Sequence, residues 1–206
     1  MAKTLLILTG PQGSGNHLWS KIFALHPQVA GWSALLDQYW IGHDQEPFAD
    51  SWRDPAMLPY HNWRADWHVT SMSVPYMENG TATVPDFKNF VKGVQNQGHR
   101  VQFAVLGRDR NILQYQQTRV RGAPTLAQAV AEFDQLASPV FLSYELLHLY
   151  GRKYIESVSK QLSFPIAFTD PRLDQILADD TNEKYFQPVD YHPTDDLARQ
   201  ASRKHS

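Results

Sequence analysis

The amino-acid sequence predicts a three-layer α/β fold, in which a mostly parallel β-sheet is flanked by helices on both faces. Short apolar runs alternate with stretches of helical periodicity along most of the chain. The first apolar run ends in a glycine-rich turn that opens directly into a helix, and a later one ends in Gly107-Arg108-Asp109 before another helix. Such alternation is typical of parallel strands joined by crossover helices, which cover both faces of the sheet.

Each predicted element has a local reason. Strands are apolar or β-branched runs, predicted at Lys3–Thr9, His68–Ser73, Val101–Leu106, Val140–Ser143 and Pro165–Phe168. Helices follow the 3.6-residue spacing, predicted at Asn16–Leu25, from Pro85 to Gly98, from Asp109 to Val120, at Thr125–Leu136 and at Tyr144–Leu162. The sequence Asn79-Gly80-Thr81 matches a glycosylation sequon and is interpreted as a turn.

Residues 31–67, called the Trp-rich segment below, contain five of the six tryptophans and have weak periodicity. We expect an irregular cap packed over the sheet, because large aromatic side chains are mostly buried for their area. Aromatic rings beside acidic groups also suit an acceptor pocket, so both interpretations stay open.

Composition excludes several classes of function. The chain has 206 residues, no cysteine and a net charge of −2, with one dense basic cluster at Arg199–His205. Disulfides, thiolate metal sites and a cysteine nucleophile are therefore excluded, and no nucleic-acid or membrane partner is expected. We expect a single domain over residues 1–206 with a C-terminal tail at 181–206. The absence of a signal peptide or a long apolar span predicts a soluble cytoplasmic protein.

The first glycine-rich turn, Gly10-Pro11-Gln12-Gly13-Ser14-Gly15-Asn16-His17, predicts an anion cradle for a phosphate or sulfate ester. Compared with the P-loop of ATP-binding proteins, Asn16 stands where the lysine belongs and His17 where the magnesium-binding hydroxyl belongs. An ordinary kinase or ATPase is therefore not favoured. A plain strand-to-helix turn is the alternative.

Arg108 follows a buried strand, as the glycine-rich turn does. Because the carboxyl ends of parallel strands lie at one edge of a sheet, we expect the two to meet there. A guanidinium at such a position suits bidentate anion binding.

In their order, these segments resemble the sulfotransferases that use 3′-phosphoadenosine 5′-phosphosulfate (PAPS). The glycine-rich turn resembles that family's 5′-phosphosulfate loop, and the run from Leu106 to Ile112 resembles its segment whose arginine holds the 3′-phosphate. Val140 to Leu147 resembles its later strand-to-helix junction, Ser163-Phe164-Pro165 follows where the family has a similar turn, and Asn182 to Phe186 with Pro188 resembles its C-terminal region.

The resemblance implies a P-loop NTPase-like fold and sulfuryl transfer from PAPS, without a metal, to a hydroxyl or amine of a small molecule or glycan. The co-substrate would contact the loop and the segment after the later strand, at Gln12, Gly13, Ser14, Gly15, Asn16, His17, Arg108 and Gln116. The acceptor stays open between a sugar, a phenol and a hydrophobic alcohol.

The chain departs from the family pattern at four positions. Gly13 replaces the loop lysine or arginine, Gln116 replaces a serine, Arg110 replaces a proline, and Ser73 stands where the catalytic base is expected. His17 and His68 are the candidate catalytic residues, because imidazole can accept a proton near neutral pH. His17 could instead donate to the sulfate, and His68 could be structural.

Three functions follow from these observations. The first is a sulfotransferase-like enzyme. The second is a nucleotide- or phosphate-binding module that has lost activity, which the glycine at position 13 favours. The third is a divergent P-loop kinase, which would need a replacement for the missing lysine and a magnesium site.

Overall fold

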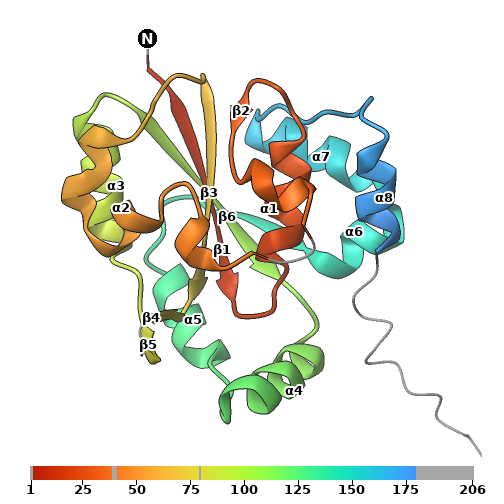
Figure 1. Ribbon diagram of the computed structural model, residues 1–206. Helices are drawn as coiled ribbons and strands as arrows, with labels where there is room; N and C mark the ends of the chain where they lie inside the picture. The colour runs from red at the N-terminus through yellow and green to blue at the C-terminus, as the bar shows by residue number, and fades with distance from the viewer. Residues whose placement is uncertain (1, 39–40, 79, 180–206) are drawn as a thin grey trace, which may run out of the picture.

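The computed structural model describes residues 2–38, 41–78 and 80–179. Its main sheet has five strands, and every neighbouring pair in it is parallel (Figure 1). In spatial order they are β2 (Val29–Ala30), β3 (Trp67–Val74), β1 (Thr4–Pro11), β6 (Arg100–Gly107) and β7 (Val140–Ser143). This arrangement confirms the predicted α/β class with a parallel sheet.

β1 lies at the centre of the sheet, between β3 and β6, and all eight of its residues are buried. Its side chains alternate between two apolar cores, with Leu6 and Leu8 in one and Leu5 and Ile7 in the other. A strand covered on both faces is apolar on both, which is why the run from Leu5 to Leu8 is continuous rather than alternating.

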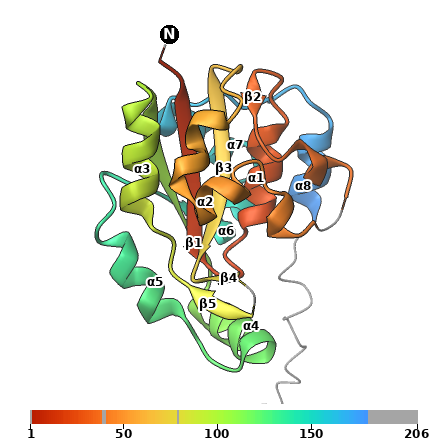
Figure 2. The same cartoon turned by 60° about the vertical axis from the view of Figure 1, so that its left-hand side comes forward.

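Helices cover both faces of the sheet (Figures 1 and 2). One face packs against α1 (Asn16–Ala24), α6 (Tyr144–Tyr150), α7 (Arg152–Leu162) and α8 (Arg172–Ala178). The other packs against α2 (Ala49–Arg53), α3 (Phe87–Asn96) and α5 (Leu126–Phe133). α4 (Arg110–Arg121) lies beyond the carboxyl ends of β1 and β6, together with the antiparallel hairpin β4 (Tyr76–Glu78) and β5 (Thr81–Thr83). The carboxyl edge of the sheet is therefore bordered by elements that do not cover its faces.

Two of the predicted elements are wrong. The helix predicted at Tyr144–Leu162 is two helices, because Gly151 adopts φ 51° and ψ −125° and ends α6. Residues 165–168 form no strand; Phe164 and Ile166 enter the core without pairing, and Arg152 donates a hydrogen bond to the Phe168 carbonyl. Arg152 also pairs with Asp174 of the unpredicted α8.

The remaining differences are short elements. The β4–β5 hairpin and β2 were not expected from the sequence, although the turn predicted at 79–81 agrees with Gly80, whose φ is 79° in that hairpin. Asn79 and the tail at 181–206, including its family-like segment, lie outside the described residues. Within the described ranges, no helix is both long and apolar enough to cross a bilayer.

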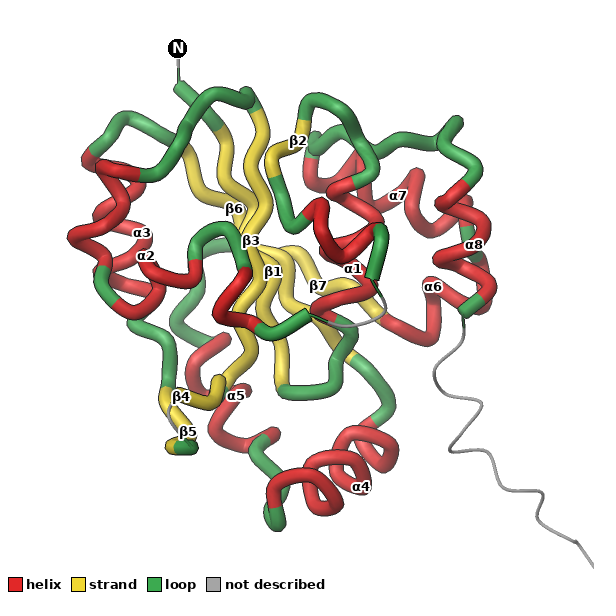
Figure 3. The backbone as a smooth tube through the Cα atoms, in the orientation of Figure 1, coloured by secondary structure: helices red, strands yellow, loops and turns green. Residues whose placement is uncertain are grey.

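The Trp-rich segment is mostly irregular, as predicted, and winds past the outer edge of β3 (Figure 3). Its regular elements are short: 3₁₀ turns η1 (Ser33–Leu36), η2 (His43–Gln45) and η3 (Pro55–Tyr60), and the helix α2. The Trp52 ring stacks on Phe90 of α3 at 3.7 Å between centroids, and Trp32 is buried with Leu35 and Ile41. These two tryptophans are packed against other apolar side chains, whereas the choice between a cap and an acceptor segment stays a prediction.

Candidate functional site

The glycine loop, residues 10–17, is a tight turn between β1 and α1. The amide of Ser14 donates to the Pro11 carbonyl at 3.1 Å and closes the turn. A Cβ atom at Gly10 would lie 2.3 Å from Ser14 Oγ and 2.7 Å from the Leu106 carbonyl oxygen, so only glycine fits there. Gly13 and Gly15 have φ values of 86° and 106°, in the left-handed region that glycine adopts most easily.

The loop leads into the N-terminus of α1, where the first backbone amides have no partner within the helix. The first helical hydrogen bond runs from the Trp19 amide to the Gly15 carbonyl, so the amides of residues 16–18 precede it. These groups and the helix dipole favour a negative charge. Ser14 Oγ is buried without a hydrogen-bond partner, and a hydroxyl at this position can donate to an oxyanion.

Asn16 connects the loop to β3. Its Nδ2 donates to Ser73 Oγ at 2.8 Å, while its Oδ1 is buried without a partner. The Ser73 hydroxyl could equally donate to Oδ1, and the rotated amide would then turn Nδ2 toward the loop. Ser73, which stands at the family's base position, therefore fixes the Asn16 side chain.

Arg108 meets the loop at the carboxyl edge, where β1 and β6 end side by side. Its Nη1 donates to the Gly13 carbonyl at 2.8 Å and lies 3.4 Å from Gln116 Oε1. Its guanidinium carbon lies 4.4 Å from the centre of the Tyr144 ring, a cation–π contact. The structure thus brings together Gly13 of the glycine loop and Arg108 and Gln116 of the segment after β6, all three of which the sequence predicted as co-substrate contacts.

Gln116 occupies the space beside position 13. A Cβ at Gly13 would lie 2.5 Å from Gln116 Oε1, and the left-handed backbone there disfavours any larger residue. The Gln116 carboxamide fills the space beside the loop, and the positive side chain nearest to it comes from Arg108.

His17 lies between the loop and the Trp-rich segment. Its ring centre is 5.0 Å from His43 and 5.1 Å from Trp32. Burial lowers the pKa of His17 to about 4, and the nearby charges of His43 and Lys21 act in the same direction. The imidazole is therefore neutral at physiological pH, which suits a proton acceptor and does not suit a permanently charged sulfate donor.

The structure does not bring His68 to the loop. His68 pairs with Leu5, five residues before Gly10 on β1, so about 16 Å of strand separates it from the loop. Its Nε2 lies 3.1 Å from the Ala65 carbonyl oxygen and its Nδ1 lies 3.5 Å from His61 Nε2. These contacts support the structural interpretation, because both ring nitrogens have protein neighbours at the amino end of the sheet.

Glu46 is a titratable residue that the sequence interpretation missed. It is buried at the edge of β3, where Oε2 accepts the Phe48 amide at 2.8 Å and Oε1 accepts the Ser71 amide at 3.3 Å. Burial raises the pKa of Glu46 to about 7, although hydrogen bonds from Thr70, Phe48 and Ser71 oppose the shift. The Trp-rich segment contains six acidic residues, and nothing in its sequence distinguishes this one from the others except that it is the only glutamate among them.

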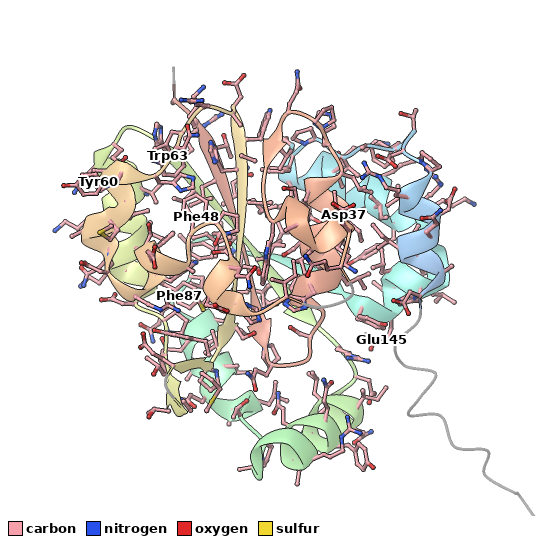
Figure 4. All side chains as sticks on the ribbon, viewed as in Figure 1. Asp37, Phe48, Tyr60, Trp63, Phe87 and Glu145 are labelled. Atoms are coloured by element: carbon pink, nitrogen blue, oxygen red, sulfur yellow. The ribbon has the colours of Figure 1, made fainter. Side chains whose placement is uncertain are left out.

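Glu145 occupies the other side of the carboxyl edge, at the start of α6 (Figure 4). It accepts hydrogen bonds from the Asp109 amide at 2.7 Å and from Ser143 Oγ at 3.2 Å. These bonds tie the ends of β6 and β7 together and fix the backbone that follows Arg108.

Among the residues that the structure describes, no group of three or more His, Cys, Asp or Glu side chains is arranged to hold a metal ion. No known protein-family model matches the chain, and a search of curated proteins gives no significant match. The site is therefore interpreted from its own geometry and from the resemblance of its motifs.

Proposed function

We propose that the protein is a sulfotransferase-like enzyme of the P-loop fold that uses PAPS as co-substrate. The observation that carries the proposal is the bond from Arg108 Nη1 to the Gly13 carbonyl at 2.8 Å. This bond places a guanidinium beside the glycine loop. The loop ends at the N-terminus of α1 and contains Ser14 Oγ, a buried hydroxyl without a hydrogen-bond partner. An ester with two separate anionic groups suits two adjoining anion sites.

The residues present fit the co-substrate in part. Residues 12–17 would hold the 5′-phosphosulfate through backbone amides and Ser14 Oγ, and Arg108 with Gln116 would hold the 3′-phosphate. The loop lysine of the family has no replacement at position 13. Charge on the transferring group would then be met by the N-terminus of α1 and the amide of Asn16.

The reaction needs a nucleophile, a leaving group and a proton acceptor. The acceptor's oxygen or nitrogen attacks sulfur, and the bond from sulfur to the 5′-phosphate oxygen breaks. The products are the sulfated acceptor and adenosine 3′,5′-bisphosphate. We assign the proton to His17, which is neutral at physiological pH and lies next to the loop. Trp32 and His43 would border the small-molecule or glycan acceptor, since their rings contact His17.

A binding module without activity is the second candidate, and the backbone of Gly13 favours it. Its φ of 86° strains any residue other than glycine, and a lysine side chain there would also have to displace the Gln116 carboxamide. Loss of one electrostatic donor of this kind typically slows a reaction by about 10²–10³-fold. Such a protein would bind the nucleotide and transfer little or nothing.

Calorimetric titration tests the proposal directly. Adenosine 3′,5′-bisphosphate should bind at least about tenfold more tightly than AMP, because the second phosphate meets Arg108. Equal affinity for the two would contradict the 3′-phosphate site, and a preference for ATP with Mg²⁺ over ATP alone would favour the kinase alternative.

A screen of hydroxyl and amine acceptors with labelled PAPS then separates enzyme from binding module. Transfer to any acceptor class supports the enzyme. Tight binding of adenosine 3′,5′-bisphosphate with no transfer across the screen supports the binding module.

A further inference from the structure

Gln117 is a buried polar residue in α4, with only 2% of its surface exposed. Both ends of its side-chain amide are bonded: Nε2 donates to the Gln12 carbonyl at 2.9 Å, and Oε1 accepts the Thr125 amide at 2.8 Å. One side chain therefore joins the glycine loop to α4 and to the start of α5. Burial of a primary amide is costly unless its groups are satisfied, and here both are.

The bond to Gln12 fixes the direction of a neighbouring donor. In a planar trans peptide the carbonyl of one residue and the amide of the next point in opposite directions. Because Gln117 holds the Gln12 carbonyl toward α4, the amide of Gly13 must point away from α4.

The next peptide unit, formed by the Gly13 carbonyl and the Ser14 amide, differs because its amide already has a partner within the turn. Arg108 holds the Gly13 carbonyl, and the amide of that unit, from Ser14, donates to the Pro11 carbonyl inside the turn. Two consecutive peptide units are thus held by their carbonyls, the first by a side chain of α4 and the second by the residue that follows β6. The first turns its amide away from α4, whereas the second uses its amide to close the loop.

We propose that Gln117 is a positioning residue that orients the Gly13 amide toward the bound oxyanion. This inference rests on the proposed anion-binding function of the loop. The motif comparison nominated Gln116, whose Oε1 lies beside Gly13, whereas its neighbour Gln117 holds the loop backbone itself.

Gln117→Glu separates the two halves of this contact. A carboxylate oxygen still accepts the Thr125 amide, but the other oxygen replaces the Nε2 donor and repels the Gln12 carbonyl. Gln117→Met removes both bonds without adding a charge and serves if the glutamate variant does not fold. Gln135→Glu, on the exposed end beyond α5, is the control for the change of charge.

The measurement is the affinity for adenosine 3′,5′-bisphosphate, together with the ¹H–¹⁵N resonance of Gly13 during the titration. We expect Gln117→Glu and Gln117→Met to weaken binding by about three- to tenfold, the range for one lost hydrogen bond, with the Gly13 shift largely lost. Gln135→Glu should bind as the wild type does. Wild-type affinity and a wild-type Gly13 shift in folded Gln117→Met protein would overturn the proposal.

A ligand-free measurement distinguishes this inference from the proposed function. Residual dipolar couplings report the orientation of the Gly13 N–H bond directly. A changed Gly13 coupling in Gln117→Met, with the couplings of β1 unchanged, supports the positioning role even if no nucleotide binds. An unchanged Gly13 coupling overturns it, whereas wild-type protein that binds neither inorganic phosphate nor the bisphosphate contradicts only the proposed function.

Discussion

The two ends of the parallel sheet carry buried or half-buried histidines in different surroundings. At the amino end, His61 and His68 lie beside each other and around Trp63, with ring centres 4.9 and 4.8 Å from it, and His61 stacks on Phe48 at 3.7 Å. At the carboxyl edge, His17 adjoins a loop in which Ser14 Oγ and Asn16 Oδ1 are buried without partners.

Burial lowers the pKa of His17, His61 and His68 alike, to about 4 in each case. A lowered histidine pKa therefore does not identify the functional end of this molecule. Unpaired buried polar atoms occur at the loop, at Ser14 Oγ and Asn16 Oδ1, and also elsewhere, at Ser71 Oγ and Gln102 Oε1. The carboxyl edge differs because its unpaired atoms lie in a glycine loop at a helix N-terminus, beside Arg108.

Substitutions of two glycines with left-handed backbones, one at each end of the sheet, should give the largest difference in nucleotide affinity. Gly15→Val should abolish nucleotide binding, by about 100-fold or more, because φ is 106° and the new Cβ would lie 3.3 Å from the Tyr144 ring. Gly98, before β6, has φ 79°, and a Cβ there would meet nothing within 4 Å. Gly98→Val should lower the free energy of unfolding by about 1–2 kcal/mol and leave calorimetric affinity unchanged. Retained binding by folded Gly15→Val protein would place the ligand elsewhere.

Histidine substitutions give the next largest contrast. His17→Gln should reduce kcat by about 10²-fold or more with any acceptor that reacts, whereas His68→Gln should leave kcat unchanged. The pH–rate profile supplies the check on the proton acceptor, which must be deprotonated to act. With His17 in that role, the rate falls only as pH decreases through about 4; with Glu46, it falls below about pH 7. A fall centred near 7 would move the role from His17 to Glu46.

Substitutions of two arginines at opposite ends of β6 should give a smaller difference in nucleotide affinity. Arg108→Ala should weaken binding of adenosine 3′,5′-bisphosphate by about tenfold or more, since a hydrogen bond to a charged group contributes about 1.5–3 kcal/mol. Arg100, at the amino end, donates to Thr4 Oγ1 at 3.2 Å, and Arg100→Ala should bind the nucleotide normally. Calorimetry on both variants checks this, and equal losses of affinity would show that the effect is not local to the loop.

The smallest expected effect is on stability at acid pH. Because the pKa of His61 falls from 6.5 to about 4 on folding, its contribution is present above pH 6.5 and is lost as pH decreases toward 4. His61→Phe keeps the stacking on Phe48 and removes the titrating group. Between pH 7 and 5, the wild type should lose about 1 kcal/mol of unfolding free energy relative to this variant, after allowance for solvent screening.

Denaturant unfolding at several pH values measures this difference, and parallel curves for the two proteins would contradict it. Glu46 acts in the opposite direction, because its raised pKa removes stability as pH increases toward and through about 7. Comparison of wild type with His61→Phe cancels that contribution, since both chains contain Glu46.

Local sequence predicts β1, α1 and the meeting of Arg108 with the loop, because apolar runs, glycines and strand ends carry their own signals. The break at Gly151 was missed because helical periodicity continues across it, and one glycine inside a helical pattern is often tolerated. Phe164 to Phe168 was mistaken for a strand because a buried apolar run has the same composition whether or not it pairs.

The partners of polar side chains were the least predictable part of the site. Gln117 differs from Gln116 only by one position on α4, yet only the packing of α4 against the loop shows which of them reaches the Gln12 carbonyl. His68 was nominated by residue type, and the length of β3 places it at the opposite end of the sheet from the loop. Glu46 depends on the path of the irregular Trp-rich segment, which carries no periodic signal.

The contact between Glu46 and Ser71 also bears on how separate molecules behave toward one another. β2 pairs with β3 only at Trp67 and His68, so the strand beyond them has an outer side that no other strand of the main sheet covers in the described part of the chain. An unpaired strand side offers amides to the strands of other chains unless the chain's own residues cover it, and here the Trp-rich segment lies against this edge of β3. The Glu46 carboxyl group accepts the Ser71 amide and, when ionised, adds a charge that repels an incoming backbone carbonyl. One buried acid thus occupies a strand amide that would otherwise be free to pair with another chain.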